Sequence, residues 1–227
     1  MTKQTQRMYE MLIRVRDFRS AHRAKIPAGS MADHVFDKVQ SAIDGVKAVH
    51  ADLISARGAL RENASAAMNL RRALRKRVNA IVVTTRGILL EPGAPSIPCD
   101  NLPRCGDFEF SSCALVRADF IEPHAHLFVG RGMPDDFLAQ FRGEASALKD
   151  AWNQRGIRRN AVVETKSRLD LVVRAGFTAV RQLDGIILNL FGDDEVMLRL
   201  WKAARRVDWW QHARKDAAAP SAVESRP

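Results

Sequence analysis

The stretch that decides the fold is residues 31–89, which read MADHVFDKVQSAIDGVKAVHADLISARGALRENASAAMNLRRALRKRVNAIVVTTRGIL. Every seventh residue within it is apolar, at Val39, Val46, Leu53, Leu60, Ala67, Leu74, Ile81 and Ile88. A seven-residue apolar repeat lines up side chains along one side of an α-helix, as in a coiled coil. The stretch therefore predicts long helices that pack along a continuous seam.

A second apolar series accompanies this seam but stops half-way along the stretch. It runs through Val35, Ala42, Val49 and Ala56 and is then interrupted by Asn63 and Arg77. A single helix over residues 31–89 would be about 90 Å long, whereas a compact domain of this chain length has a radius of gyration of about 17 Å. We therefore expect a hairpin, with its turn near residues 58–63 and a third helix that ends near residue 89.

The composition of the 227-residue chain also favours helices. Hydrophobic residues make up 46% and charged residues 27%, as in ordinary globular proteins, while aromatic residues are few at 7%. Alanine, leucine, arginine and valine dominate, and this mixture favours helices over sheets because β-structure relies on aromatic and β-branched residues. The predicted fold is all-α: an antiparallel helical bundle of about six to seven helices with a long coiled-coil-like hairpin.

The longest predicted loop divides the chain. Residues 91–107, EPGAPSIPCDNLPRCGD, contain four prolines and two glycines and are expected to form a linker. We predict an N-terminal helical half of three helices over residues 1–90, a C-terminal helical half over residues 108–215, and a disordered tail over residues 216–227. The two halves form either separate lobes or one bundle with a crossover between them.

Local signals predict the helix ends in the N-terminal half. A first helix over about residues 2–24 should end before Pro27. Ser30 is then placed to cap the second helix, and Asp33 lies in its first turn, where the helix dipole favours a negative charge.

Similar signals occur in the C-terminal half. We expect a fourth helix over residues 108–129 that is kinked or restarted at Pro123. Pro134 should begin a fifth helix that ends near residues 154–156. A long sixth helix follows, and Asp193 should cap a short last one.

The net charge of +10 is concentrated in two segments. Residues 1–30 hold seven basic and two acidic residues, and residues 63–90 hold six basic residues and no acidic one. The second segment contains the run NLRRALRKRVN, with cations at Arg71, Arg72, Arg75 and Lys76. Cations at this helical spacing could follow a phosphate backbone, so these four residues are the predicted nucleic-acid-binding site. Alternatively, they pair with an acidic second helix or form a solvated face.

Other candidate sites have weaker patterns. Cys99, Cys105, Cys113, His124 and His126 carry groups that zinc favours, but gaps of five and seven residues between the cysteines differ from the usual knuckle of two to four. Free thiols and surface histidines are therefore expected, without a cofactor. The chain contains no G-x-S-x-G, P-loop or H-E-x-x-H motif, so no catalytic residue is predicted.

The tryptophans offer two further interpretations. Trp209 and Trp210 lie among several basic residues, an arrangement that suits partner docking, a membrane surface or the end of a bundle. Trp152 and Trp201 are expected to be core or boundary residues. The sequence has no stretch of about 18 apolar residues and no apolar signal region at its start, so we expect a cytoplasmic protein without a transmembrane segment.

Several pieces of the chain resemble a family of uncharacterised bacterial helical-bundle proteins. They are PAGS at 27–30, LPR at 102–104, IEPH at 121–124, GMPDDFLAQF at 132–141 and TKSRLDLVVRAGFTAVRQLDGIILNLFGDDEVMLRLWKAARRV at 165–207. The resemblance covers roughly residues 5–208 and implies an all-α bundle, with no activity, ligand or catalytic residue to carry over. The chain departs from the family pattern near residues 56–65, where a longer glycine- and serine-rich loop is expected.

These observations favour a non-enzymatic helical scaffold or protein-interaction protein, whose apolar seams could also support self-association. The alternative is a sequence-nonspecific nucleic-acid-binding protein that uses the basic face around residues 71–77.

Overall fold

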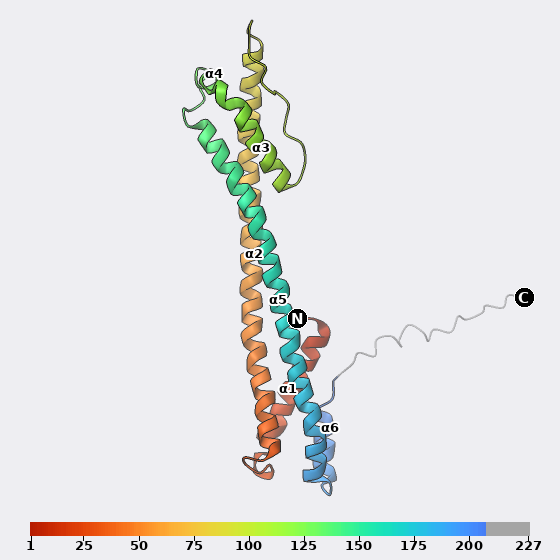
Figure 1. Cartoon of the computed structure of the whole chain (residues 1–227). Coiled ribbons are helices and arrows are strands. Elements are labelled where there is room, and N and C mark those ends of the chain that lie inside the picture. The colour runs from red at the N-terminus through yellow and green to blue at the C-terminus, as the bar shows by residue number, and fades with distance from the viewer. Residues whose placement is uncertain (208–227) are drawn as a thin grey trace, which may run out of the picture. The chain divides into compact units, whose positions relative to one another are not determined.

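The computed structural model describes residues 1–207, and these residues form six α-helices and two short 3-10 helices without any β-strand. The α-helices, labelled in Figure 1, are α1 (Lys3–Ala21), α2 (Met31–Leu89), α3 (Asp107–Ile121), α4 (Ala125–Val129), α5 (Phe137–Phe191) and α6 (Glu195–Ala204). The 3-10 helices are η1 (Arg23–Lys25) and η2 (Glu122–His124). The predicted all-α class is confirmed.

The predicted hairpin over residues 31–89 is wrong, because α2 is one helix of 59 residues. No proline occurs within it, and a glycine in a helix interior costs only about 1 kcal/mol, so Gly58 does not end it. The polar residues that interrupt the second apolar series are also helical. Arg77 binds Glu144 of α5, so the interruption at Arg77 reflects a polar contact with another helix and not a turn.

The predicted helix end near residues 154–156 is also wrong, because α5 continues through Gly156 as one helix of 55 residues. It begins at Phe137, so the predicted start at Pro134 is wrong by three residues. Pro134 lies in the preceding turn, where its carbonyl accepts from the Phe137 N–H at 3.0 Å. The expected restart at Pro123 is confirmed, since η2 separates α3 from α4. Thus the count of six helices is near the prediction, although two predicted pairs are each a single helix.

The chain divides into two compact units that share α2 and α5. The first unit contains Met1–His50 and the chain from Lys166 onward, and the second contains Ala51–Thr165. The proline-rich segment 91–107 lies inside the second unit. In each unit the two long helices run side by side in opposite directions (Figure 1).

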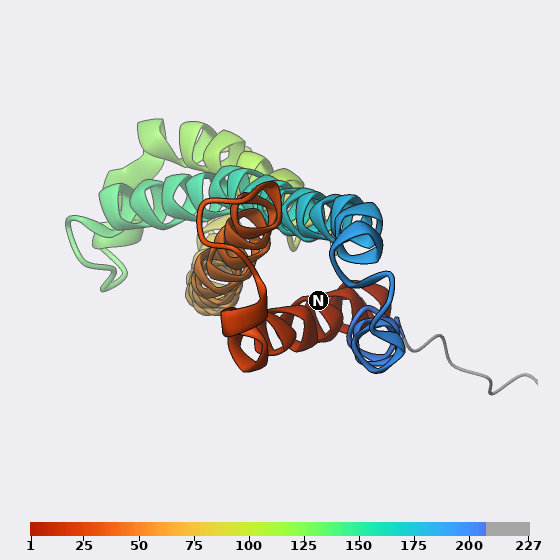
Figure 2. The same cartoon turned by 90° about the horizontal axis from the view of Figure 1, so that it is seen from below.

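The first unit packs α1 and α6 against the paired parts of α2 and α5, with α6 beside α1 (Figure 2). Trp201 is buried, as expected: its ring lies 5.3 Å from that of Phe18, and its indole N–H donates to Asp184 at 2.9 Å. At Gly176 of α5 the neighbouring helices leave no room for a side chain. A Cβ there would lie 2.7 Å from Leu12 Cδ1 and 2.9 Å from Ala42 Cβ.

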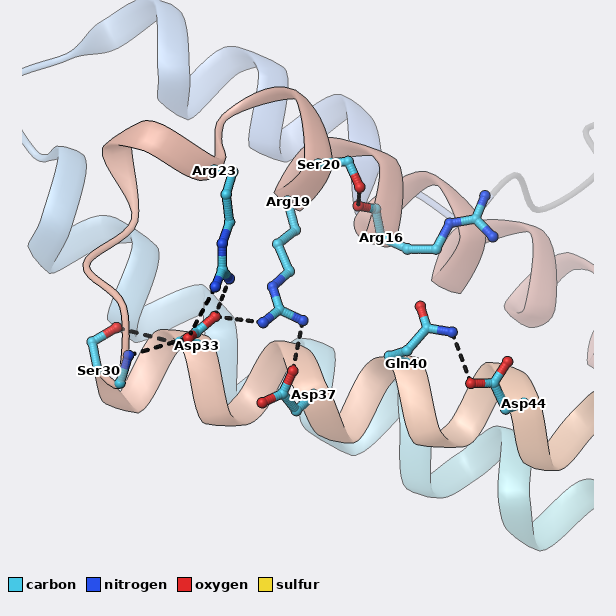
Figure 3. A network of polar contacts seen from close by, with 10 residues as sticks. Arg16, Arg19, Ser20, Arg23, Ser30, Asp33, Asp37, Gln40 and Asp44 are labelled. Atoms are coloured by element: carbon cyan, nitrogen blue, oxygen red, sulfur yellow. Dashed lines mark hydrogen bonds and ion pairs between the residues drawn. The ribbon is translucent and has the colours of Figure 1, made fainter.

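An ionic network fixes the turn between α1 and α2 in this unit (Figure 3). Asp33, whose side chain is 12% exposed, accepts hydrogen bonds from Arg23 and Arg19, and Arg19 also binds Asp37 at 2.8 Å. Ser30 caps α2 as predicted, because its Oγ accepts from the Asp33 N–H at 3.3 Å. The hydrogen bonds from Arg23 and Arg19 hold the pKa of Asp33 well below its ordinary value.

The second unit has a separate core made by α2, α3, α4 and α5 with the proline-rich segment. Four of its phenylalanines are almost fully buried: Phe110, Phe128, Phe137 and Phe141. The rings of Phe128 and Phe137 stack at 5.5 Å. Ile97 of the proline-rich segment is also buried, so this segment is part of the core and not a free linker.

The remaining predictions concern the C-terminal part of the chain. The cap of α6 is Asp194, whose side chain accepts from the Met197 N–H at 3.1 Å, and not its neighbour Asp193. Trp209, Trp210 and the predicted tail at 216–227 lie outside the described residues. None of the described helices is both long enough and apolar enough to cross a membrane.

Candidate functional site

The first candidate is the basic run of α2, and the structure divides its cations into two groups. Arg71 binds the carboxylate of Asp107 and the backbone carbonyl of Cys105, and its guanidinium lies 5.1 Å from the centre of the Phe110 ring. These contacts attach the end of the proline-rich segment and the start of α3 to α2. Arg71 therefore has a structural role within the second unit.

Arg77 is also engaged inside the unit. Its Nη2 and Nε donate to the two carboxylate oxygens of Glu144 at 2.7 and 3.0 Å, a bidentate pair between α2 and α5. The hydrogen bond with Glu144 raises the pKa of the Arg77 guanidinium. The basic run thus finds its acidic partners on α3 and α5, and not on an antiparallel second helix as the hairpin required.

The other predicted nucleic-acid-binding residues are exposed. Arg72, Arg75 and Lys76 all face solvent, and Arg75 lies over the outer side of the second core, 5.7 Å from the centre of the Phe110 ring. The structure thus leaves three of the four predicted cations accessible. Their role in binding a polyanion stays a prediction.

A second candidate lies where the packing of the second unit thins out. No residue of α2 between Leu53 and Ala67 is buried, and none of α5 between Leu148 and Val162. Of the eight apolar residues in the seven-residue repeat, seven are buried and Leu60 alone is half-exposed. The apolar seam of α2 therefore continues through this region, but the side chains of α5 do not cover it fully.

An open groove of about 630 Å³ lies between these stretches of α2 and α5, and we call it the arginine groove. It is lined by Leu60, Arg61 and Ala64 of α2 and by Trp152, Asn153, Arg155, Gly156 and Arg159 of α5. Trp152 is 45% exposed and packs against Phe108 of α3, with ring centres 5.0 Å apart, so it is a boundary residue as expected. A Cβ on Gly156 would have no other atom within 4 Å, so the groove is open above this glycine.

The charge of the groove is uniform. Its lining contains three arginines, Arg61, Arg155 and Arg159, and no acidic residue. Arg158, in the same turn of α5 as Arg155 and Arg159, donates from Nη1 to the Ala59 carbonyl at 3.1 Å, while its Nε is buried without a hydrogen-bond partner among the described residues. Unlike Arg71 and Arg77, the three lining arginines have no carboxylate in their own groove.

Sequence reasoning missed this groove because its two walls are about 95 residues apart in the chain and meet only when α2 and α5 are both continuous. One signal was available on α5, where Trp152, Gly156 and Arg159 recur at helical spacing on one face. The predicted helix end at 154–156 hid this pattern. Comparison with known proteins adds no assignment: no family model matches the chain, and no significant match is found to a curated protein or a solved structure.

Proposed function

We propose that this protein is a non-enzymatic helical scaffold that binds an acidic, amphipathic segment of a partner protein in the arginine groove. The observation that carries the proposal is Leu60, the only half-exposed member of an otherwise buried apolar repeat, lying beside three arginines in a groove without an acidic residue.

The chemistry of the groove defines the partner. Leu60, Ala64 and Trp152 offer an apolar floor, and the surrounding guanidinium groups match carboxylates in bidentate geometry. A helix laid into a groove buries apolar side chains at intervals of three and four residues. A partner helix with leucines on one edge and glutamates beside them would satisfy both parts of the surface, and tryptophan and arginine are the residues that most often dominate binding energy.

Binding to this groove can be tested with a defined peptide. We would measure fluorescence anisotropy of a labelled amphipathic helix that carries leucine and glutamate on one face, and use the same peptide with glutamine in place of glutamate as its control. The Gly156→Leu variant should bind at least about tenfold more weakly, because the new side chain fills the groove.

A matched variant separates this effect from a general change in α5. Gly143 is another exposed α5 glycine in the same unit with no atom near its Cβ position, and it lies outside the groove. Gly143→Leu should therefore bind like the unchanged protein. Equal affinities of the Gly156→Leu and Gly143→Leu variants would reject the groove as the binding site.

Two other outcomes would replace the proposal. If the protein forms a dimer that Gly156→Leu dissociates in sedimentation experiments, the occupant of the groove is a second copy of the chain. Nucleic acid is the rival ligand, favoured by the exposure of Arg72, Arg75 and Lys76. Duplex DNA that binds with a steep loss of affinity as salt rises, and that no longer binds when these three residues are changed to glutamine, would support it.

A further inference from the structure

A second pocket, independent of the arginine groove, lies between α2 and the proline-rich segment. It has a volume of about 440 Å³, and its polar lining consists of Arg75 and Asn79 from α2 with Asn101 and Arg104 from the segment. Phe110 of α3, which is only 3% exposed, also contributes to its wall. Its volume is in the range of small-molecule sites.

The wall formed by residues 101–104 is held on both sides. On one side Arg117, a buried side chain of α3, donates from Nη1 to the carbonyls of Pro98 at 3.2 Å and Asp100 at 2.9 Å. On the other side Arg71 binds the Cys105 carbonyl and Asp107. A buried guanidinium is costly to leave without hydrogen-bond acceptors. Moving the Pro98 and Asp100 carbonyls away from Arg117 would therefore be unfavourable, and the segment is held in one path.

The cationic wall of the pocket is also ordered. The guanidinium of Arg75 lies 5.7 Å from the centre of the Phe110 ring, a cation–π contact that limits where this side chain can point. The guanidinium of Arg71 lies 5.1 Å from the centre of the same ring. The nearby carboxylate of Asp107 is bound by Arg71 and not by Arg75. The lining of the pocket contains no acidic residue.

We infer that this pocket binds a small organic anion through a phosphate or carboxylate group. Arg75 and Arg104 supply paired N–H donors of the kind that match oxyanions, and the amides of Asn79 and Asn101 supply both donors and acceptors for hydroxyl or carbonyl groups beside the anion. The shared chemistry is an oxyanion on a small molecule. The proline-rich segment is then a binding element that α3 holds against α2.

Calorimetric titration of the whole protein tests this inference with two probes, inorganic phosphate and citrate. Saturable binding of either probe is expected, and the stronger one identifies the oxyanion. Arg104→Gln should weaken that binding by about tenfold or more, since a charged hydrogen-bonding partner is lost, while Arg104→Lys should retain part of it. Arg104 is exposed, so an unchanged melting temperature would show that the fold is intact.

The matched control is Arg72→Gln, which removes an exposed cation from α2, the helix that carries Arg75, without touching the pocket. It should leave the affinity unchanged. Equal weakening by Arg72→Gln and Arg104→Gln would mean that the anion follows overall charge, and the absence of saturable binding by both probes would also overturn the inference. The pocket shares no lining residue with the arginine groove, so Gly156→Leu should leave the binding of phosphate or citrate unchanged.

Discussion

At the scale of single residues, the strongest local interactions surround Asp33. Three elements meet at this carboxylate: α1 through Arg19, η1 through Arg23, and the start of α2, where Ser30 and Asp33 cap the helix. The sequence identified the cap, because a serine in the turn before a helix and an acidic residue in its first turn are local signals. It did not identify the two arginines as partners, since they lie 14 and 10 residues away and meet Asp33 only after the chain has turned.

Asp33 should therefore make stability depend on pH. Its pKa in the folded protein lies below the ordinary value of 3.8, so its contribution is fully present only well above that value and is lost progressively as pH falls from about 5 toward the lower folded pKa. Asp33→Asn should lower the melting temperature at pH 7 and flatten the loss of stability below pH 5. Thermal unfolding across this pH range measures both effects. Asp17→Asn, at a carboxylate whose side chain is 60% exposed, should cause neither.

At the scale of elements, the seven-residue repeat predicted the buried side of α2 with one exception. Seven of its eight residues are buried, and Leu60 is the exception. The repeat could not predict where the helix ends, because Gly58 and Asn63 are compatible with both a turn and a helix interior. What decides between them is α5, whose Glu144 and Arg158 contact α2 from sequence positions far away.

The continuity of α2 can be tested at Gly58. A Cβ at this position would have no other atom within 4 Å, so Gly58→Ala should stabilise the protein by about 1 kcal/mol through helix propensity. Gly29, in the turn before α2, has φ +70°, a conformation that alanine adopts only with strain, so Gly29→Ala should destabilise the protein. Denaturant unfolding of the two variants provides the comparison. A loss of stability in Gly58→Ala would indicate a turn at that residue.

At the scale of the whole molecule, two hydrophobic cores are built on the same two long helices. All-α architecture followed from composition and periodicity, whereas the division into units did not, because each unit combines segments that are far apart in the sequence. The proline-rich segment was recognised as non-helical from its four prolines. Its place in the second core depends on Ile97 and Arg117, whose contacts have no counterpart in a local pattern.

Hydrogen exchange should reveal the thin packing of the second unit. Residues 54–66 of α2 and 149–161 of α5 are stretches of these helices in which no side chain is buried, so local opening there exposes little apolar surface. We expect their amides to exchange at least about tenfold faster than amides near Leu74 and Ile81 in the same unit. Binding of the acidic peptide should slow the exchange of residues 54–66 and 149–161 selectively. Uniform protection along α2 would contradict this picture.

The close approach at Gly176 determines how the length of this chain can change over evolutionary time. Deleting or inserting one residue of α5 between Leu169 and Gly176, both in the first unit, would rotate the two parts of the helix by about 100° relative to each other. A side chain would then take the place of the glycine hydrogen, against Leu12 and Ala42. Related sequences should therefore keep constant the spacing between Gly176 and Leu169, which is buried in the same unit.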